Sequence, residues 1–211
     1  MRKPHNRKYY VFCGIIVFVL LVSLICVFII MPRGKPLVAI KTEPLYELVQ
    51  DGDIICRLGD RFWSRMFSDL SMEDKRYSHL GIIRIYNDKI TVIHSEGDTG
   101  HGRDYVHEEP IKDFLRIARA VGIYRVKNAD GSIISKTALD YLGTPFDWKF
   151  DISDNSKIYC TELLYVILQC VMPDIQLNKV YVKEMKMDVI PLEAISGSDY
   201  FTEIFFSKYS K

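Results

Sequence analysis

The stretch YCTELLYVILQCV, residues 159–171, predicts the helix on which the expected fold and chemistry depend. Its apolar side chains share one face at helical spacing: Leu163, Leu164, Ile167 and Val171. Cys160 lies in the first turn, after a polar stretch at 151–157, and Pro173 ends the pattern. Unpaired N–H groups and the helix dipole at such a place favour a thiolate, so we expect a nucleophilic Cys160 with a lowered pKa. A buried, inert cysteine is the alternative from local position alone.

Two histidines lie at the ends of two predicted strands, 80–86 and 89–95, which a turn at 87–88 joins as a hairpin. His79 precedes the first strand and His94 falls near the end of the second. Cross-strand neighbours lie about 5 Å apart, so the two rings can touch. His79 is therefore a candidate general base, and His94 a candidate for the residue that fixes its tautomer.

The remaining polar residues near this hairpin leave alternatives open. Glu96 has the same parity along its strand as His94 and is the fallback for the orienting role. A hydrogen-bonded histidine at a strand edge, without a catalytic role, is the alternative for His79. His101 and His107 fall in a polar stretch, where we expect solvated surface residues.

The order of the predicted elements indicates the fold class. Further strands are predicted at 54–58 and 118–126, helices at 61–70 and 134–142, and a final strand or packed segment within 196–211. Strands and helices alternate too poorly for a doubly wound parallel sheet. The sequence therefore predicts an α+β domain.

Four short motifs carry a family resemblance. They are Asp51-Gly52-Asp53-Ile54-Ile55, Tyr77-Ser78-His79-Leu80-Gly81-Ile82-Ile83, Val92-Ile93-His94-Ser95 and Tyr159-Cys160-Thr161-Glu162-Leu163-Leu164. Their order resembles the circularly permuted NlpC/P60 group of papain-like proteins, which includes YiiX-like and YaeF-like proteins. In this group the histidine precedes the cysteine helix, whereas ordinary papain-like chains have the cysteine first. The similarity spans about residues 48 to 195.

The resemblance implies a permuted papain-like domain, over 46–211, whose antiparallel sheet packs on the cysteine helix. It also implies nucleophile Cys160, base His79 and orienting residue His94, although members of this group often have glutamate at the third position. Tyr159 is expected to help build the oxyanion site, and Glu162 to support the helix start or the site.

The activity that the resemblance implies is that of a cysteine peptidase or amidase working through an acyl-enzyme. We expect no metal and no organic cofactor. The expected substrate is a cell-wall peptide cut at an amide bond. A lipid-directed acyl hydrolase or acyltransferase is the alternative enzyme, and a catalytically inactive, membrane-tethered binding module is the alternative of another class.

The N-terminal segment predicts membrane attachment. Residues 11–31 carry no charge and are long enough to cross the roughly 30 Å hydrocarbon core of a bilayer. Four basic residues precede this run, at 2, 3, 7 and 8, and two follow it, at 33 and 35. The excess before the run places the basic N-terminus, 1–10, in the cytoplasm and the catalytic domain outside, after a linker at 32–45. A cleaved signal peptide is the alternative, but the run exceeds the usual apolar length and no small-x-small site follows it.

Composition excludes several function classes. A net charge of +1 gives no field that would favour nucleic acid. The five cysteines are irregularly spaced and contain no CxxC pair, which argues against a zinc site or a disulfide framework.

Overall fold

The centre of the protein is an antiparallel sheet of six strands in the order β4-β3-β2-β1-β5-β8. The computed structural model describes residues 43–208 apart from 61, 98–103, 155 and 184. The strands of the sheet are β1 (Ile54–Gly59), β2 (His79–Tyr86), β3 (Lys89–Glu96), β4 (Tyr105–Pro110), β5 (Ala118–Val126) and β8 (Phe201–Lys208). A separate ribbon pairs β6 (Val180–Val182) with β7 (Met187–Val189).

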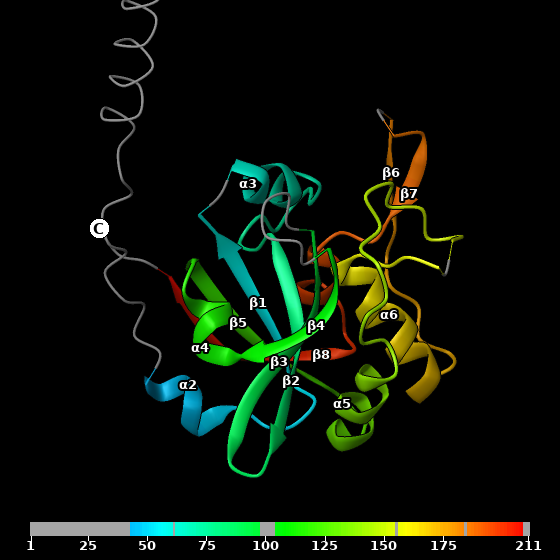
Figure 1. Ribbon diagram of the computed structural model, residues 1–211. Coiled ribbons are helices and arrows are strands. Elements are labelled where there is room, and N and C mark those ends of the chain that lie inside the picture. The colour runs from blue at the N-terminus through cyan, green and yellow to red at the C-terminus, as the bar shows by residue number, and fades with distance from the viewer. Residues whose placement is uncertain (1–42, 61, 98–103, 155, 184, 209–211) are drawn as a thin grey trace, which may run out of the picture. The chain divides into compact units, whose positions relative to one another are not determined.

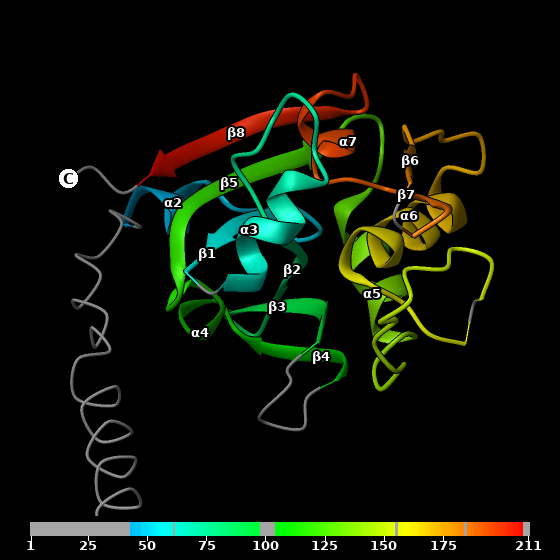
Figure 2. The ribbon, with the colours of Figure 1, turned by 90° about the horizontal axis from the view of Figure 1, so that it is seen from above.

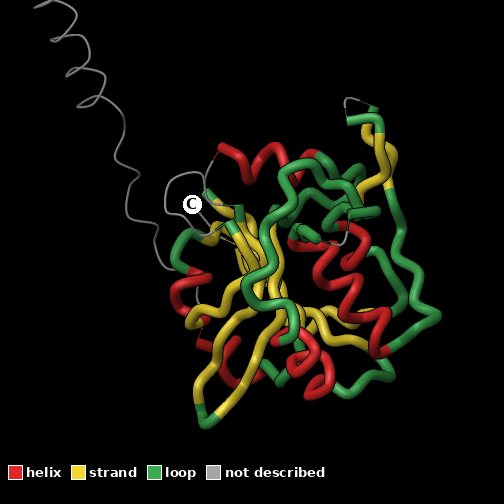
Figure 3. The backbone as a smooth tube through the Cα atoms, turned by 45° about the vertical axis from the view of Figure 1, so that its right-hand side comes forward, coloured by secondary structure: helices red, strands yellow, loops and turns green. Residues whose placement is uncertain are grey.

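Helices cover both faces of the sheet, as Figures 1 and 2 show. They are α2 (Glu43–Leu48), α3 (Phe62–Asp69), α4 (Ile111–Leu115), α5 (Gly131–Leu139), α6 (Cys160–Val171) and α7 (Glu193–Ser196). Helices α5 and α6 lie on one side of the sheet, and α2 and α4 on the other (Figures 1 and 3). The arrangement agrees with the predicted α+β class, an antiparallel sheet packed on the cysteine helix.

Side chains of the central strands alternate between two apolar cores. On β1, Ile54 packs in the core that Leu163 of α6 completes, whereas Ile55 packs in the opposite core with Phe114 of α4. Because both faces of the sheet are buried, β1 and β2 have apolar residues at consecutive positions. Each fully buried aliphatic side chain contributes about 1.5–3 kcal/mol to folding. The first of these cores fixes the cysteine helix against β2.

The strongest sequence patterns gave the right elements. Helix α6 and strand β5 have the predicted bounds, 160–171 and 118–126. The predicted hairpin of β2 and β3 turns at Asn87 and Asp88, whose φ angles of 48° and 58° suit the mirror-image turns that follow the strand twist. Helix α2 begins at Glu43, within the segment expected as linker.

The expectation of a polar surface at His107 is wrong. His107 lies in β4, which pairs with β3. Val106 packs in the apolar core, while the His107 ring is 9 % exposed and lies against His94. One apolar position in a six-residue strand gives too weak a period-two pattern for the strand to be predicted. His101 lies outside the described residues.

The predicted transmembrane run, 11–31, also lies outside the described residues. Within the part of the chain that the structure describes, no helix is both long enough and apolar enough to cross a bilayer.

Candidate active site

Cys160 is the first residue of α6, where the sequence placed it. Tyr159 is the N-cap, and its backbone N–H donates to the carboxylate of Glu162 at 3.3 Å. The Cys160 side chain is half-buried and lines a cavity that opens beside the helix start. Hydrogen bonding from the backbone N–H groups of Leu80 and Thr161 lowers the pKa of the thiol. The contact with Leu80, the neighbour of His79, brings the sulfur to the start of β2.

The expectation of a lowered pKa at Cys160 is nevertheless wrong. Burial raises the pKa of the thiol to about 11, because desolvation penalises the thiolate more than the helix start and the N–H groups stabilise it. The position in the helix favours the anion as predicted, but the apolar surroundings, which the local sequence does not show, outweigh it. Cys160 therefore rests as a neutral thiol.

His79 is the first residue of β2 and lines the same cavity as Cys160. Its Nε2 lies 2.8 Å from Nδ1 of His94, so the predicted contact between the two rings is confirmed. Burial, and then the positive charge of Arg57, lowers the pKa of His79 well below its ordinary value. Among the described residues no hydrogen bond joins the His79 ring to Cys160, so the two groups must align when a substrate binds, as catalytic groups often do.

His94 is fully buried behind His79. Its ring lies 4.3 Å from that of His107 and 5.1 Å from that of Phe114, measured between centroids. Burial lowers the pKa of His94 to about 4 despite a contact with the Glu109 carboxylate. The ring is therefore neutral at physiological pH.

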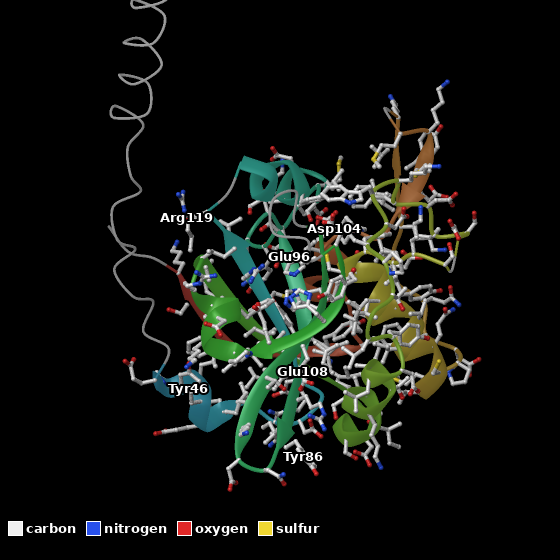
Figure 4. All side chains as sticks on the ribbon, viewed as in Figure 1. Tyr46, Tyr86, Glu96, Asp104, Glu108 and Arg119 are labelled. Atoms are coloured by element: carbon white, nitrogen blue, oxygen red, sulfur yellow. The ribbon has the colours of Figure 1, made fainter. Side chains whose placement is uncertain are left out.

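Glu96, the fallback orienting residue, has a different partner. Its carboxylate forms an ion pair with Arg57, which also donates to the carbonyl of Phe114 at 2.7 Å. Glu96 lies at the α3 end of the sheet, whereas Tyr86 marks the opposite end, at the tip of the β2–β3 hairpin (Figure 4). The structure thus brings His94, and not Glu96, to the ring of His79.

The cavity beside Cys160 has a largely apolar wall. The apolar and aromatic side chains that line it are Phe67, Leu70, Ile117, Phe146, Trp148, Phe150, Tyr159, Val189, Ile190, Pro191 and Leu192. The charged residues in its wall, Arg57 and Glu96, neutralise each other. A buried histidine pair and a half-buried cysteine at a helix start therefore share an apolar cavity.

The chain is also similar to known proteins. Residues 48–189 match the family described as permuted papain-like amidase enzymes, YaeF/YiiX, C92 family. The chain belongs to this family. The predicted resemblance is confirmed.

Two relatives are consistent with this membership. The uncharacterized protein YiiX of Escherichia coli strain K12 is 29 % identical over 127 residues, which make up 57 % of this chain and 57 % of that protein. The chain therefore spans little more than half the length of this relative. The crystal structure of metalloprotein yiiX from Escherichia coli O157:H7 superposes with a TM-score of 0.63 and 20 % identity, covering 78 % of this chain and 99 % of the other. The latter likeness supports the fold.

In this permuted papain-like chain, Tyr159 and Glu162 hold the walls of the site. The hydroxyl of Tyr159 accepts the backbone N–H of Ile190 at 3.0 Å, and Thr161 donates to the Ile190 carbonyl at 2.6 Å. These bonds tie the helix start to the segment before α7. Glu162 is 2 % exposed, and burial raises the pKa of its carboxyl to about 8. Its contact with the Tyr159 N–H agrees with the expected support of the helix start.

Three polar residues of the site were missed by the sequence analysis: Arg57, His107 and Glu109. Arg57 is 2 % exposed, and its guanidinium lies 4.1 Å from the centroid of the Phe114 ring. A charged residue inside an apolar strand is the signal that could have identified it. His107 and Glu109 lie on β4 and gave no comparable signal.

Two histidines and a glutamate of the site form a candidate metal-binding group. One ligand atom each from His94, Glu96 and His107 lie within 4.8 Å of one another, and two imidazoles with a carboxylate are a donor set that metals accept. The Arg57 guanidinium, however, already holds the Glu96 carboxylate and would repel a second cation there. The residues as arranged do not fit a metal ion, so no step of the chemistry is assigned to one.

Proposed function

We propose that this chain is a cysteine hydrolase that cleaves an amide bond, with Cys160 as nucleophile, His79 as general base and His94 as the residue that orients His79. One observation carries the proposal: Cys160, at a helix start, and His79, hydrogen-bonded to a second buried histidine, line one cavity. Membership in a family of permuted papain-like amidases supports the same chemistry.

The resting site favours general-base attack over a stored thiolate. With a thiol pKa of about 11 and a depressed pKa at His79, both groups are neutral before substrate binds. The thiol proton passes to Nδ1 of His79 as the sulfur bonds to the substrate carbonyl. The backbone N–H of Cys160, at the helix start, donates to the oxyanion that forms.

The intermediate then collapses in the usual two stages. The C–N bond breaks, and His79 returns its proton to the leaving amine, which leaves a thioester on Cys160. Water, deprotonated by His79, attacks the thioester carbonyl. The S–C bond breaks, the carboxylic acid departs and the thiol is regenerated. The chain's own residues supply every proton transfer in this scheme.

The proposed substrate is a cell-wall peptide, on the outer side of a membrane to which residues 11–31 anchor the domain. The charge-free run and the basic residues before it support this orientation. Resistance of the full chain to alkaline carbonate extraction, together with protease access to the domain from outside the cell, tests the anchor. A protein released by carbonate would contradict it.

The cavity wall favours a second candidate, a thiol acyl hydrolase or acyltransferase acting on lipid. Phe146, Trp148 and Phe150 form a contiguous aromatic group in this wall. The centroid of the Phe146 ring lies 4.9 Å from that of Trp148 and 6.0 Å from that of Phe150. Such a wall suits an aliphatic acyl chain, since burial of each CH₂ contributes about 0.8 kcal/mol.

The two candidates are separated by incubating the full chain, solubilised in detergent, with muropeptides and separately with phospholipid vesicles. Products are followed by mass spectrometry, with Cys160→Ala as the matched control. New amine and carboxyl ends in muropeptides support the peptide substrate, and released fatty acid supports the lipid. Equal turnover by Cys160→Ala would refute the mechanism, and binding of muropeptide without turnover would favour a tethered binding module.

A further inference from the structure

A line of three polar side chains crosses strands β2, β3 and β4. His79 Nε2 lies 2.8 Å from His94 Nδ1, and His94 Nε2 lies 3.2 Å from an oxygen of Glu109. The His94 side chain is fully buried and that of Glu109 is 13 % exposed. The β3–β4 register pairs His94 with His107, so Glu109 lies two residues further along β4 on the same face. The line therefore ends at a carboxylate on the side away from the cavity.

The chemistry of the three groups favours one placement of the protons along this line. An ionised carboxylate only accepts, and a neutral imidazole has one N–H and one lone pair. Burial raises the pKa of Glu109, but the contact with His94 outweighs it and keeps the pKa below its ordinary value. An ionised Glu109 favours a proton on the His94 nitrogen that faces it, Nε2 at 3.2 Å. His94 Nδ1 then holds the lone pair and accepts the N–H of His79 Nε2.

The consequence at His79 is a lone pair on Nδ1. This nitrogen is the one that His94 does not occupy, and it is the atom that must accept the thiol proton. Without a carboxylate at the far end, the reverse arrangement becomes available: His94 Nδ1 donates to His79 Nε2, and the proton of His79 moves to Nδ1. An imidazole in that tautomer cannot act as the base.

We propose that Glu109 is a positioning residue that fixes the tautomers of His94 and His79 and so leaves the basic lone pair on Nδ1 of His79. The inference rests on the proposed function in that it takes His79 as the general base. Two neighbouring groups are already engaged: Glu96 is paired with Arg57, and His107 Nδ1 contacts the carbonyl of Tyr105 at 3.1 Å.

Ring nitrogens observed by long-range ¹H–¹⁵N NMR of the full chain in detergent test the tautomers directly. In the wild-type protein we expect His94 and His79 each to carry the proton on Nε2. A proton on Nδ1 of either ring overturns the proposal. This measurement needs neither a substrate nor a folded variant, and it stands whether or not Cys160 is the nucleophile.

Variants supply the second readout. In Glu109→Ala we expect both rings to populate the other tautomer, and kcat for a p-nitrophenyl acyl ester to fall about 10- to 100-fold with KM within about twofold, as for the partners that orient catalytic or ligating histidines. Glu109→Gln, whose amide oxygen still accepts, should recover most of kcat. Unchanged ring spectra in Glu109→Ala overturn the proposal.

Glu108→Ala is the matched control. The neighbouring carboxylate contacts Arg84 and Thr91 on the other side of the strand pair, and Figure 4 shows it on β4 away from Glu96. Its ring spectra and kcat should equal those of the wild type. Equal kcat losses in Glu108→Ala and Glu109→Ala overturn the inference, whereas ester turnover that survives Cys160→Ala refutes the proposed nucleophile and leaves the tautomer result intact.

Discussion

The carboxylate of Glu96 is bound to Arg57, although Glu96 lies only two residues from His94 on the same strand. The two residues therefore have different roles, and we expect substitutions of His94 to lower kcat and substitutions of Glu96 to lower stability. His94→Ala removes the partner of His79 Nε2, so we expect kcat to fall about 100-fold or more with little change in KM. Initial-rate kinetics with a p-nitrophenyl ester measure kcat and KM for the variant and the wild type.

Glu96→Gln should act on stability instead. It leaves a buried arginine without its charge partner, which typically costs about 3–5 kcal/mol. Denaturant unfolding should show the loss, while kcat of the folded fraction stays within about threefold of wild type. A loss of kcat as large as that of His94→Ala, with unfolding unchanged, would assign the orienting role to Glu96 after all.

The neutral thiol at Cys160 predicts slow alkylation at neutral pH. Burial raises its pKa to about 11, so the rate with iodoacetamide should keep rising from pH 7 to pH 10, because the thiolate fraction rises tenfold per pH unit below the pKa. Rates are measured in a Cys170→Ser background, which removes the exposed thiol, and Cys160→Ser gives the blank. A plateau reached by pH 7 would indicate a preformed thiolate.

Glu162 should make the fold less stable as the pH rises from about 4.5 to 8. Its folded pKa is raised to about 8 by burial, against 4.5 for an ordinary carboxyl. From pH 4.5 to 8 the unfolded chain loses a proton that the folded chain keeps, so stability falls as pH rises, by up to about 1.4 kcal/mol per unit. Glu162→Gln should flatten this slope in urea titrations. A variant with the wild-type slope would show that the Glu162 carboxyl does not carry it.

Gly81 gives a geometric test of the histidine contact. A Cβ there would lie 2.4 Å from Val92 Cγ1 and 3.0 Å from His94 Cβ, so Gly81→Ala must displace β3 at His94. We expect a stability cost of about 1–3 kcal/mol and a fall in kcat of about tenfold.

Gly143→Ala is the control for that loss of stability. Its φ of +85° strains an alanine, yet a Cβ there meets no atom within 4 Å, so it should cost about 1 kcal/mol without changing kcat. Equal kcat in both variants would show that catalysis is insensitive to the position of His94.

The parts of the fold that could be predicted are those whose signal is local. The apolar face of 160–171 predicts a helix, and Asn87 and Asp88 predict a turn, from a few neighbouring residues each. The same is true of His79 and His94, which the hairpin alone brings together. Local pattern also placed Cys160 at a helix start.

What escaped prediction depends on distant segments. The thiol pKa is set by desolvation, which requires α6, β2 and the segment at 189–192 to be packed. Glu109 reaches His94 only through β3–β4 pairing, and Val106, the apolar residue on the opposite face of β4, gave no usable pattern. Arg57 stands out as a charge inside an apolar strand, but its partners, Glu96 and Phe114, come from distant segments of the chain.

The order of the strands and the cysteine helix also affects how the protein is made. Synthesis proceeds from the N-terminus, so the β2–β3 hairpin with both histidines leaves the ribosome well before Cys160. When Cys160 emerges, both histidines have already been synthesised, and only the segment at 189–192, which completes the burial of the thiol, is still to follow. In an ordinary papain-like order the cysteine would be synthesised before its histidine, whereas the permuted order makes the nucleophile the last of the three proposed catalytic residues to appear.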